Sequence, residues 1–99
     1  PIKKDMGWCN DPKNKKYYNK LIKKQKSIKH ETLYRKDYKY DFLIPIKYNT
    51  KKIIHGKGSA IFIHLTKDYK KTLGCIALKQ NDLLILLKLI NKKTKIRII

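Results

Sequence analysis

Apolar and polar residues alternate along two short segments in the second half of the chain. In residues 59–65 the large odd-numbered residues are apolar and share one face, while His64 lies on the other face. In residues 75–79 the even-numbered residues are apolar, and Cys75 lies on the opposite face. The pattern predicts two strands whose apolar faces meet in one core, so that His64 and Cys75 come together on the other side.

Weaker patterns predict the remaining elements. Residues 38–48 are rich in aromatic and β-branched residues and indicate a strand, in which Pro45 favours an edge or a bulge. Residues 14–24 are compatible with a short helix, and residues 95–99 indicate a final strand. A helix is expected over residues 82–91, capped by Gln80 or Asn81 with Asp82 in its first turn, and buried because it is apolar on most sides. We therefore expect a single, mainly β domain over residues 1–99 with one C-terminal helix.

The two predicted strands carry a pair of residues suited to nucleophilic catalysis. A cysteine attacks as its thiolate, and a neighbouring imidazole is the common means of generating that thiolate. Gly74 directly precedes Cys75 and lets the backbone approach a ligand closely, and amides beside a nucleophile can stabilise an oxyanion. We interpret Cys75 as a nucleophile and His64 as its general base; the alternative is that Cys75 only fills space in the core.

The residues around this pair resemble a known family. Residues 58–64 read GSAIFIH, and residues 72–78 read TLGCIAL. Together they resemble the catalytic core of the YkuD-like L,D-transpeptidases, in the branch with the pattern GSAIF-hydrophobic-H followed by T-x-GC-hydrophobic-AL. Upstream segments that fit the same branch, in the same order, are WCNDP at 8–12, YN at 18–19, HE at 30–31, and then Leu33, Arg35, Asp37, Tyr40 and Asp41. The resemblance therefore extends from Trp8 to the C-terminus.

The resemblance implies an L,D-transpeptidase-like β-sandwich core that lacks the N-terminal strands found in family domains before the tryptophan motif. It implies a cysteine-dependent transferase that acts on peptidoglycan stem peptides through a thioester acyl-enzyme, with L,D-carboxypeptidase activity when water is the acceptor. The amides of Gly74 and Cys75 would hold the oxyanion, no cofactor would be needed, and the protein would work in the periplasm or cell envelope. Two residues depart from the pattern of the branch: Lys71 replaces a usual proline, and Asn10 replaces a usual aspartate. Ala77 stands where the wider family often has arginine, but alanine is normal in this branch.

Several other residues allow more than one interpretation. Ser59 either hydrogen-bonds near the site or opens the strand, and Thr72 either donates to a substrate or shapes the loop. His55 is a rival general base, because His55-Gly56 is similar to a His-Gly element of the wider family. Cys9 is interpreted as a packing residue. Scattered histidines and the lack of a CxxC pair argue against a metal site.

The charge of the chain has two interpretations, an anionic partner or a compositional drift toward lysine. The net charge is +19, which favours nucleic acid or an anionic envelope polymer. Only two of the 26 basic residues are arginines, and this argues against specific nucleic-acid recognition, for which arginine is the preferred residue. Two alternatives to the enzyme therefore stay open: an inactive envelope or binding domain of the same fold, and a basic nucleic-acid-binding protein. The longest apolar run, near residues 83–90, is too short to span a membrane.

Overall fold

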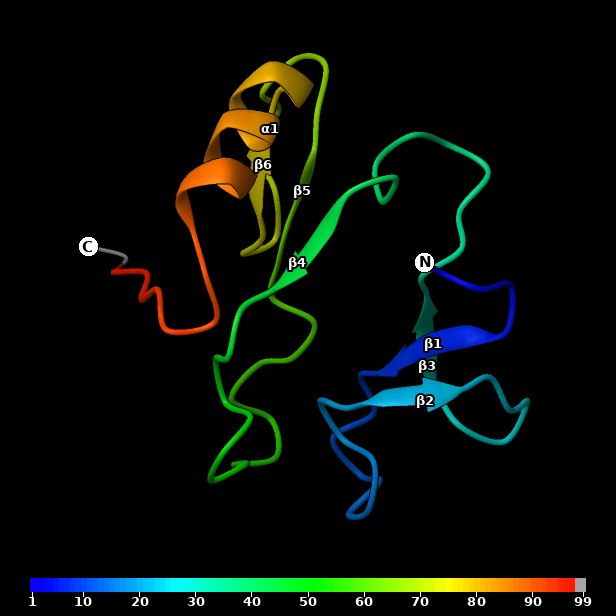
Figure 1. Cartoon of the computed structure of the whole chain (residues 1–99). Coiled ribbons are helices and arrows are strands. Elements are labelled where there is room, and N and C mark those ends of the chain that lie inside the picture. Colours follow the sequence, from blue (N-terminus) through cyan, green and yellow to red (C-terminus); the bar gives the residue numbers. More distant parts are fainter. Residues whose placement is uncertain (98–99) are drawn as a thin grey trace.

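The chain folds into two small sheets and one helix. The structure, a computed structural model, describes residues 1–97. Figure 1 shows the two sheets side by side, with the helix packed on the outside of the second sheet. The elements of the described residues are, in chain order, β1 (Met6–Cys9), β2 (Leu21–Lys23), β3 (His30–Thr32), β4 (Leu43–Pro45), β5 (Phe62–Leu65), β6 (Ile76–Leu78) and α1 (Gln80–Leu89). The expected mainly β architecture with a C-terminal helix is confirmed.

Each sheet has three strands, with one strand in the middle. In the first sheet β1 pairs antiparallel with β2 on one side and β3 on the other. In the second sheet β5 is central, antiparallel to β4 and parallel to β6. All four residues of β5 are buried, as expected for a central strand covered on both faces. Pro45 ends the edge strand β4, which confirms the expected edge position.

The alternation in β5 separates two hydrophobic clusters. One cluster, here called the inter-sheet core, contains side chains from both sheets, and its buried members are Leu33, Tyr40, Ala60 and Phe62. Trp8 of β1 packs edge to face on Phe62 of β5, with ring centroids 5.2 Å apart. The other cluster, here called the helix-side core, joins Ile63 and Leu65 of β5 to Leu83 of α1. The faces predicted for residues 59–65 and 75–79 are therefore confirmed.

The strand that contains His64 begins later than predicted, at Phe62 rather than at Ser59. Ala60 has φ of +53°, which is outside the extended region, and its N–H donates to the Asn19 side chain instead of to a neighbouring strand. The strand predicted over 38–48 is likewise reduced to Leu43–Pro45, since the preceding residues form bends and turns. The strand predicted over 75–79 is observed as Ile76–Leu78.

Four other predictions about elements were wrong. Residues 14–24 form turns followed by the strand β2 rather than a helix, because Asn19 adopts φ of +57° and ends the helical turn that starts at Asn14. The helix begins at Gln80, and Lys79 occupies the cap position without a side-chain cap. Its burial was also overestimated, since Leu83 is its buried residue and Leu89 is 76% exposed. Residues 95–97 do not form the predicted final strand, and 98–99 lie outside the described residues.

The side-chain amide of Asn19 connects the two halves of the fold. Its Oδ1 accepts hydrogen bonds from Nε1 of Trp8 at 2.8 Å and from the backbone N–H of Ala60 at 3.1 Å. Its Nδ2 donates to the carbonyl oxygens of Tyr48 at 2.9 Å and Asn49 at 2.7 Å. Asn19 is only 3% exposed, so each of these groups would be costly to leave unpaired.

We expect Asn19→Ala to lower the free energy of unfolding by about 2–4 kcal/mol, because it leaves several buried polar groups without partners. Urea denaturation measures this change. Asn10→Ala is the matched control, because Oδ1 of Asn10 is buried without a hydrogen-bond partner among residues 1–97 and its removal should cost little. Equal losses in the two variants would contradict the role given to Asn19.

Candidate active site

The pairing of β5 with β6 places Cys75 and His64 on the same face of the second sheet. The parallel register aligns His64 with Ala77 and Ile63 with Ile76. Cys75, one residue before β6, therefore lies beside Phe62 and one diagonal step from His64. Cys75 packs against the inter-sheet core, which confirms the predicted common face.

The His64 ring is buried and has a defined tautomer when neutral. Its residue exposure is 8%, and Nδ1 lies 2.9 Å from the carbonyl oxygen of Leu65. A carbonyl oxygen can only accept, so Nδ1 carries the proton of the neutral imidazole. The lone pair is then on Nε2, which makes Nε2 the basic atom of this ring.

The thiol of Cys75 is half-buried and is held by the backbone of the preceding segment. Sγ donates to the carbonyl oxygen of Ala60 at 3.3 Å, and within residues 1–97 no hydrogen bond joins it to His64. Burial raises the pKa of the Cys75 thiol, the backbone N–H of Phe62 lowers it, and the negative charge of Glu31 raises it further. The balance favours the neutral thiol, so a base is needed to generate the nucleophile.

A short turn directly precedes Cys75. The hydroxyl of Thr72 donates to the carbonyl oxygen of Cys75 at 2.5 Å and accepts a long bond of 3.4 Å from the N–H of Gly74. Gly74 has φ of +136°, a conformation that residues with a Cβ rarely adopt. In this structure Thr72 therefore shapes the loop, which was one of its two expected roles.

Sequence reasoning interprets a group of side chains next to the pair as structural and gives them no part in the site. The ring of Tyr40 contacts the ring of His64, with centroids 5.6 Å apart, and its hydroxyl donates to Oε1 of Glu31. Arg35 lies over the Tyr40 ring, 5.0 Å from its centroid. The sequence signal available for these residues was their place in the family pattern, since they lie in three separate segments and share no local periodicity.

The other candidates lie elsewhere. His55 is exposed and stacks on Tyr18, with centroids 5.2 Å apart, and no described contact joins it to Cys75. Ser59 is half-buried just before β5, and no hydrogen bond of its hydroxyl is found within residues 1–97. Cys9 is fully buried with Ile22 of β2, in agreement with a packing role, and both cysteines are free thiols.

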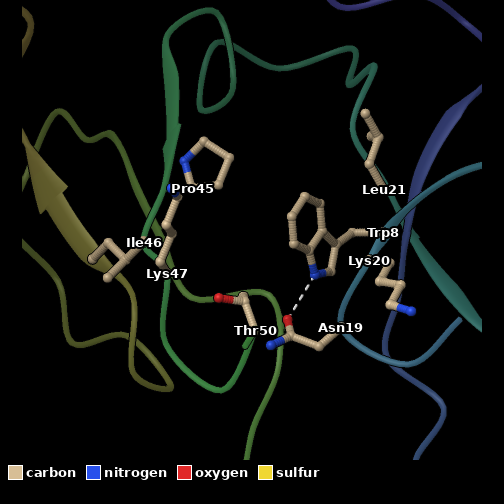
Figure 2. Close-up of a pocket in the computed structure, with 8 residues that line it drawn as sticks. All are labelled: Trp8, Asn19, Lys20, Leu21, Pro45, Ile46, Lys47 and Thr50. Carbon is tan, nitrogen blue, oxygen red and sulfur yellow. Dashed lines mark hydrogen bonds between the residues drawn. The ribbon is translucent and has the colours of Figure 1, made fainter. Parts of the chain in front are cut away.

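A pocket lies between the two sheets, away from the candidate pair. Its volume is about 420 Å³, and Figure 2 shows the Trp8 indole projecting into it next to the Asn19 amide. The remaining lining residues are Lys20, Leu21, Pro45, Ile46, Lys47 and Thr50. The polar groups of Trp8 and Asn19 already have partners within the protein.

Two other kinds of functional feature are absent from the described part of the chain. Among residues 1–97, no three His, Cys, Asp or Glu side chains are grouped in a way that could hold a metal ion. Over the same residues, no helix has the length and apolar character needed to cross a membrane.

Comparison with known proteins places the chain in a family. The family model for the L,D-transpeptidase catalytic domain, YkuD, matches residues 2–98, which is nearly the whole chain. Comparisons with curated proteins and with solved structures gave no match. Members of this family are transferases linked to the peptidoglycan cell wall. The chain belongs to the family of L,D-transpeptidase catalytic domains.

Proposed function

We propose that this domain is a cysteine-dependent L,D-transpeptidase that acts on peptidoglycan stem peptides in the cell envelope. The observation that carries the proposal is the position of Cys75 and His64 on one face of the β5–β6 pair, in a chain matched by the family over residues 2–98. The bond from Nδ1 of His64 to the Leu65 carbonyl supports the role of Nε2 as the base.

The first half-reaction forms a thioester. The Sγ–H of Cys75 turns from the Ala60 carbonyl toward Nε2 of His64, which takes the proton. The thiolate attacks the carbonyl carbon of an L-centre in the donor peptide; the S–C bond forms and the C–N bond to the terminal D-amino acid breaks. His64 returns its proton to the leaving amine. The backbone N–H groups of Gly74 and Cys75 are the hydrogen-bond donors nearest in sequence to the nucleophile, and we assign them to the developing oxyanion.

The second half-reaction regenerates the thiol. An acceptor amine attacks the thioester, a new amide forms, and the proton lost by the amine passes through His64 to the sulfur of Cys75. When water is the acceptor, the product is a carboxylic acid and the enzyme acts as an L,D-carboxypeptidase. These steps need no metal or organic cofactor, since the thiol, the imidazole and the two peptides account for all bonds and protons.

We expect a synthetic stem peptide that ends in an L-centre residue followed by a D-amino acid to acylate Cys75. Intact-protein mass spectrometry measures the adduct. Cys75→Ala should give none, and His64→Ala should slow acylation by about 10²–10⁴-fold because it removes the general base. His55→Ala should acylate at the wild-type rate. Acylation that persists in Cys75→Ala would exclude the mechanism, and a folded wild type without adduct would favour the inactive binding domain.

We also expect Gly74→Ala to slow acylation by about 10–10²-fold, because the new Cβ disfavours φ of +136° and turns the neighbouring amides away from the oxyanion. A Cβ at this position would also lie 3.4 Å from Cδ1 of Ile61. Gly56→Ala is the matched control: its φ is +87°, its surroundings are open, and acylation should stay at the wild-type rate. Equal rates in the two variants would argue against the amide role.

A further inference from the structure

Tyr40 lies beside His64, and it also contacts Glu31, Phe62 and Arg35. It is 7% exposed, and its hydroxyl donates to Oε1 of Glu31 on β3. Its ring meets the ring of His64 at 5.6 Å and Phe62 edge to face at 5.8 Å. Arg35 lies 5.0 Å from the ring centroid. The position of the Tyr40 ring therefore limits how the imidazole can move.

The charges around Tyr40 are arranged so that Arg35 does not neutralise Glu31 directly. Arg35 makes two hydrogen bonds to the carboxylate of Asp37, at 2.8 Å and 2.5 Å. These hydrogen bonds hold the pKa of Asp37 at about 2, so this pair stays charged at neutral pH. Glu31 bonds instead to the neutral hydroxyl of Tyr40.

The same carboxylate lies near Cys75, because Cys75 packs against the inter-sheet core that contains Tyr40, the hydrogen-bond partner of Glu31. The ionisable groups around the thiol come from three elements: His64 of β5, Glu31 of β3 and Tyr40 of the turn before β4, with Arg35 behind Tyr40. Burial and then the hydrogen bond to Glu31 raise the pKa of Tyr40, so Tyr40 stays a neutral donor. Burial is the main cause that disfavours the Cys75 thiolate, and the negative charge of Glu31 adds to it.

We propose that Tyr40, anchored by Glu31, is the positioning residue that orients the His64 imidazole, and that the charge of Glu31 adds to burial in keeping Cys75 as a thiol in the substrate-free protein. The expected effect of Tyr40 on catalysis rests on the proposed function. The expected effects on the Cys75 thiol and on the mobility of the His64 ring do not. The thiol then loses its proton to His64 when substrate is bound, and the free protein carries no standing thiolate open to oxidation or alkylation.

The experiment separates the hydrogen bond from the charge with three variants. Glu31→Gln keeps an oxygen that can accept the Tyr40 hydroxyl but removes the charge, and Glu31→Ala removes both. Tyr40→Phe removes the hydrogen bond and keeps the charge. Tyr38→Phe is the matched control, because Tyr38 packs on the helix-side core, on the other face of the sheet. Urea denaturation verifies that each variant is folded.

Three measurements are made on the full chain: the pH profile of Cys75 alkylation by iodoacetamide, NMR relaxation of the His64 ring, and kcat and KM with the stem peptide. In Glu31→Gln and Glu31→Ala the alkylation midpoint should move to lower pH, because removal of a negative charge favours the thiolate. In Tyr40→Phe the alkylation midpoint should not move to lower pH, because the charge of Glu31 is kept. In Tyr40→Phe and Glu31→Ala the His64 ring should become more mobile and kcat should fall about tenfold with KM little changed.

The outcomes that overturn the proposal are separate from those that overturn the function. An alkylation midpoint that does not move in Glu31→Gln excludes the charge role of Glu31. An equally ordered His64 ring in Tyr40→Phe excludes the positioning role of Tyr40, as does a change of the same size in Tyr38→Phe. A wild type without peptide turnover refutes the proposed function, whereas the alkylation and relaxation data still decide the roles of Glu31 and Tyr40.

Discussion

The four hydrogen bonds of the Asn19 side chain are the constraint on which the site depends. They tie Trp8 of the first sheet to the segments that precede β5 and follow β4. One of them holds the N–H of Ala60, a residue with φ of +53°. The carbonyl of the same residue accepts the Cys75 thiol at 3.3 Å. An amide in the N-terminal third of the chain therefore fixes the backbone against which the candidate nucleophile rests.

A second constraint is the placement of the site on a strand that is covered on both faces. Ile63 and Leu65 bind β5 to the helix-side core, while Phe62 and His64 face the inter-sheet core. A histidine on such a strand has little freedom, since both of its neighbours along the chain are fixed by packing. This rigidity is useful for a general base, because proton transfer requires a defined geometry. The packing residues of β5 therefore fix the position of His64, although they take no part in the proposed reaction.

The parts of this structure that sequence reasoning could predict are those encoded by local pattern. Alternation of side chains gave the faces of β5 and β6, and the glycine before Cys75 indicated the unusual backbone there. The structural role of Asn19 could not be derived from local pattern, because its partners lie 11 to 41 residues away and asparagine is typical of turns. The helix was placed two residues late because its cap, Lys79, lacks the side chain that usually marks a helix start.

Sequence reasoning interprets Glu31 and Tyr40 as structural residues, and their place beside the site could not be predicted for a similar physical reason. Lysines dominate the surface, and every lysine of the chain is exposed. In a chain with a net charge of +19, a carboxylate would be expected to find a lysine partner, as Asp68 does with Lys70 at 3.6 Å. Glu31 instead lies half-buried against a neutral hydroxyl, where water and mobile ions offset its charge least. Its negative charge therefore adds to burial in raising the pKa of the nearby Cys75 thiol, despite the surrounding excess of positive charge.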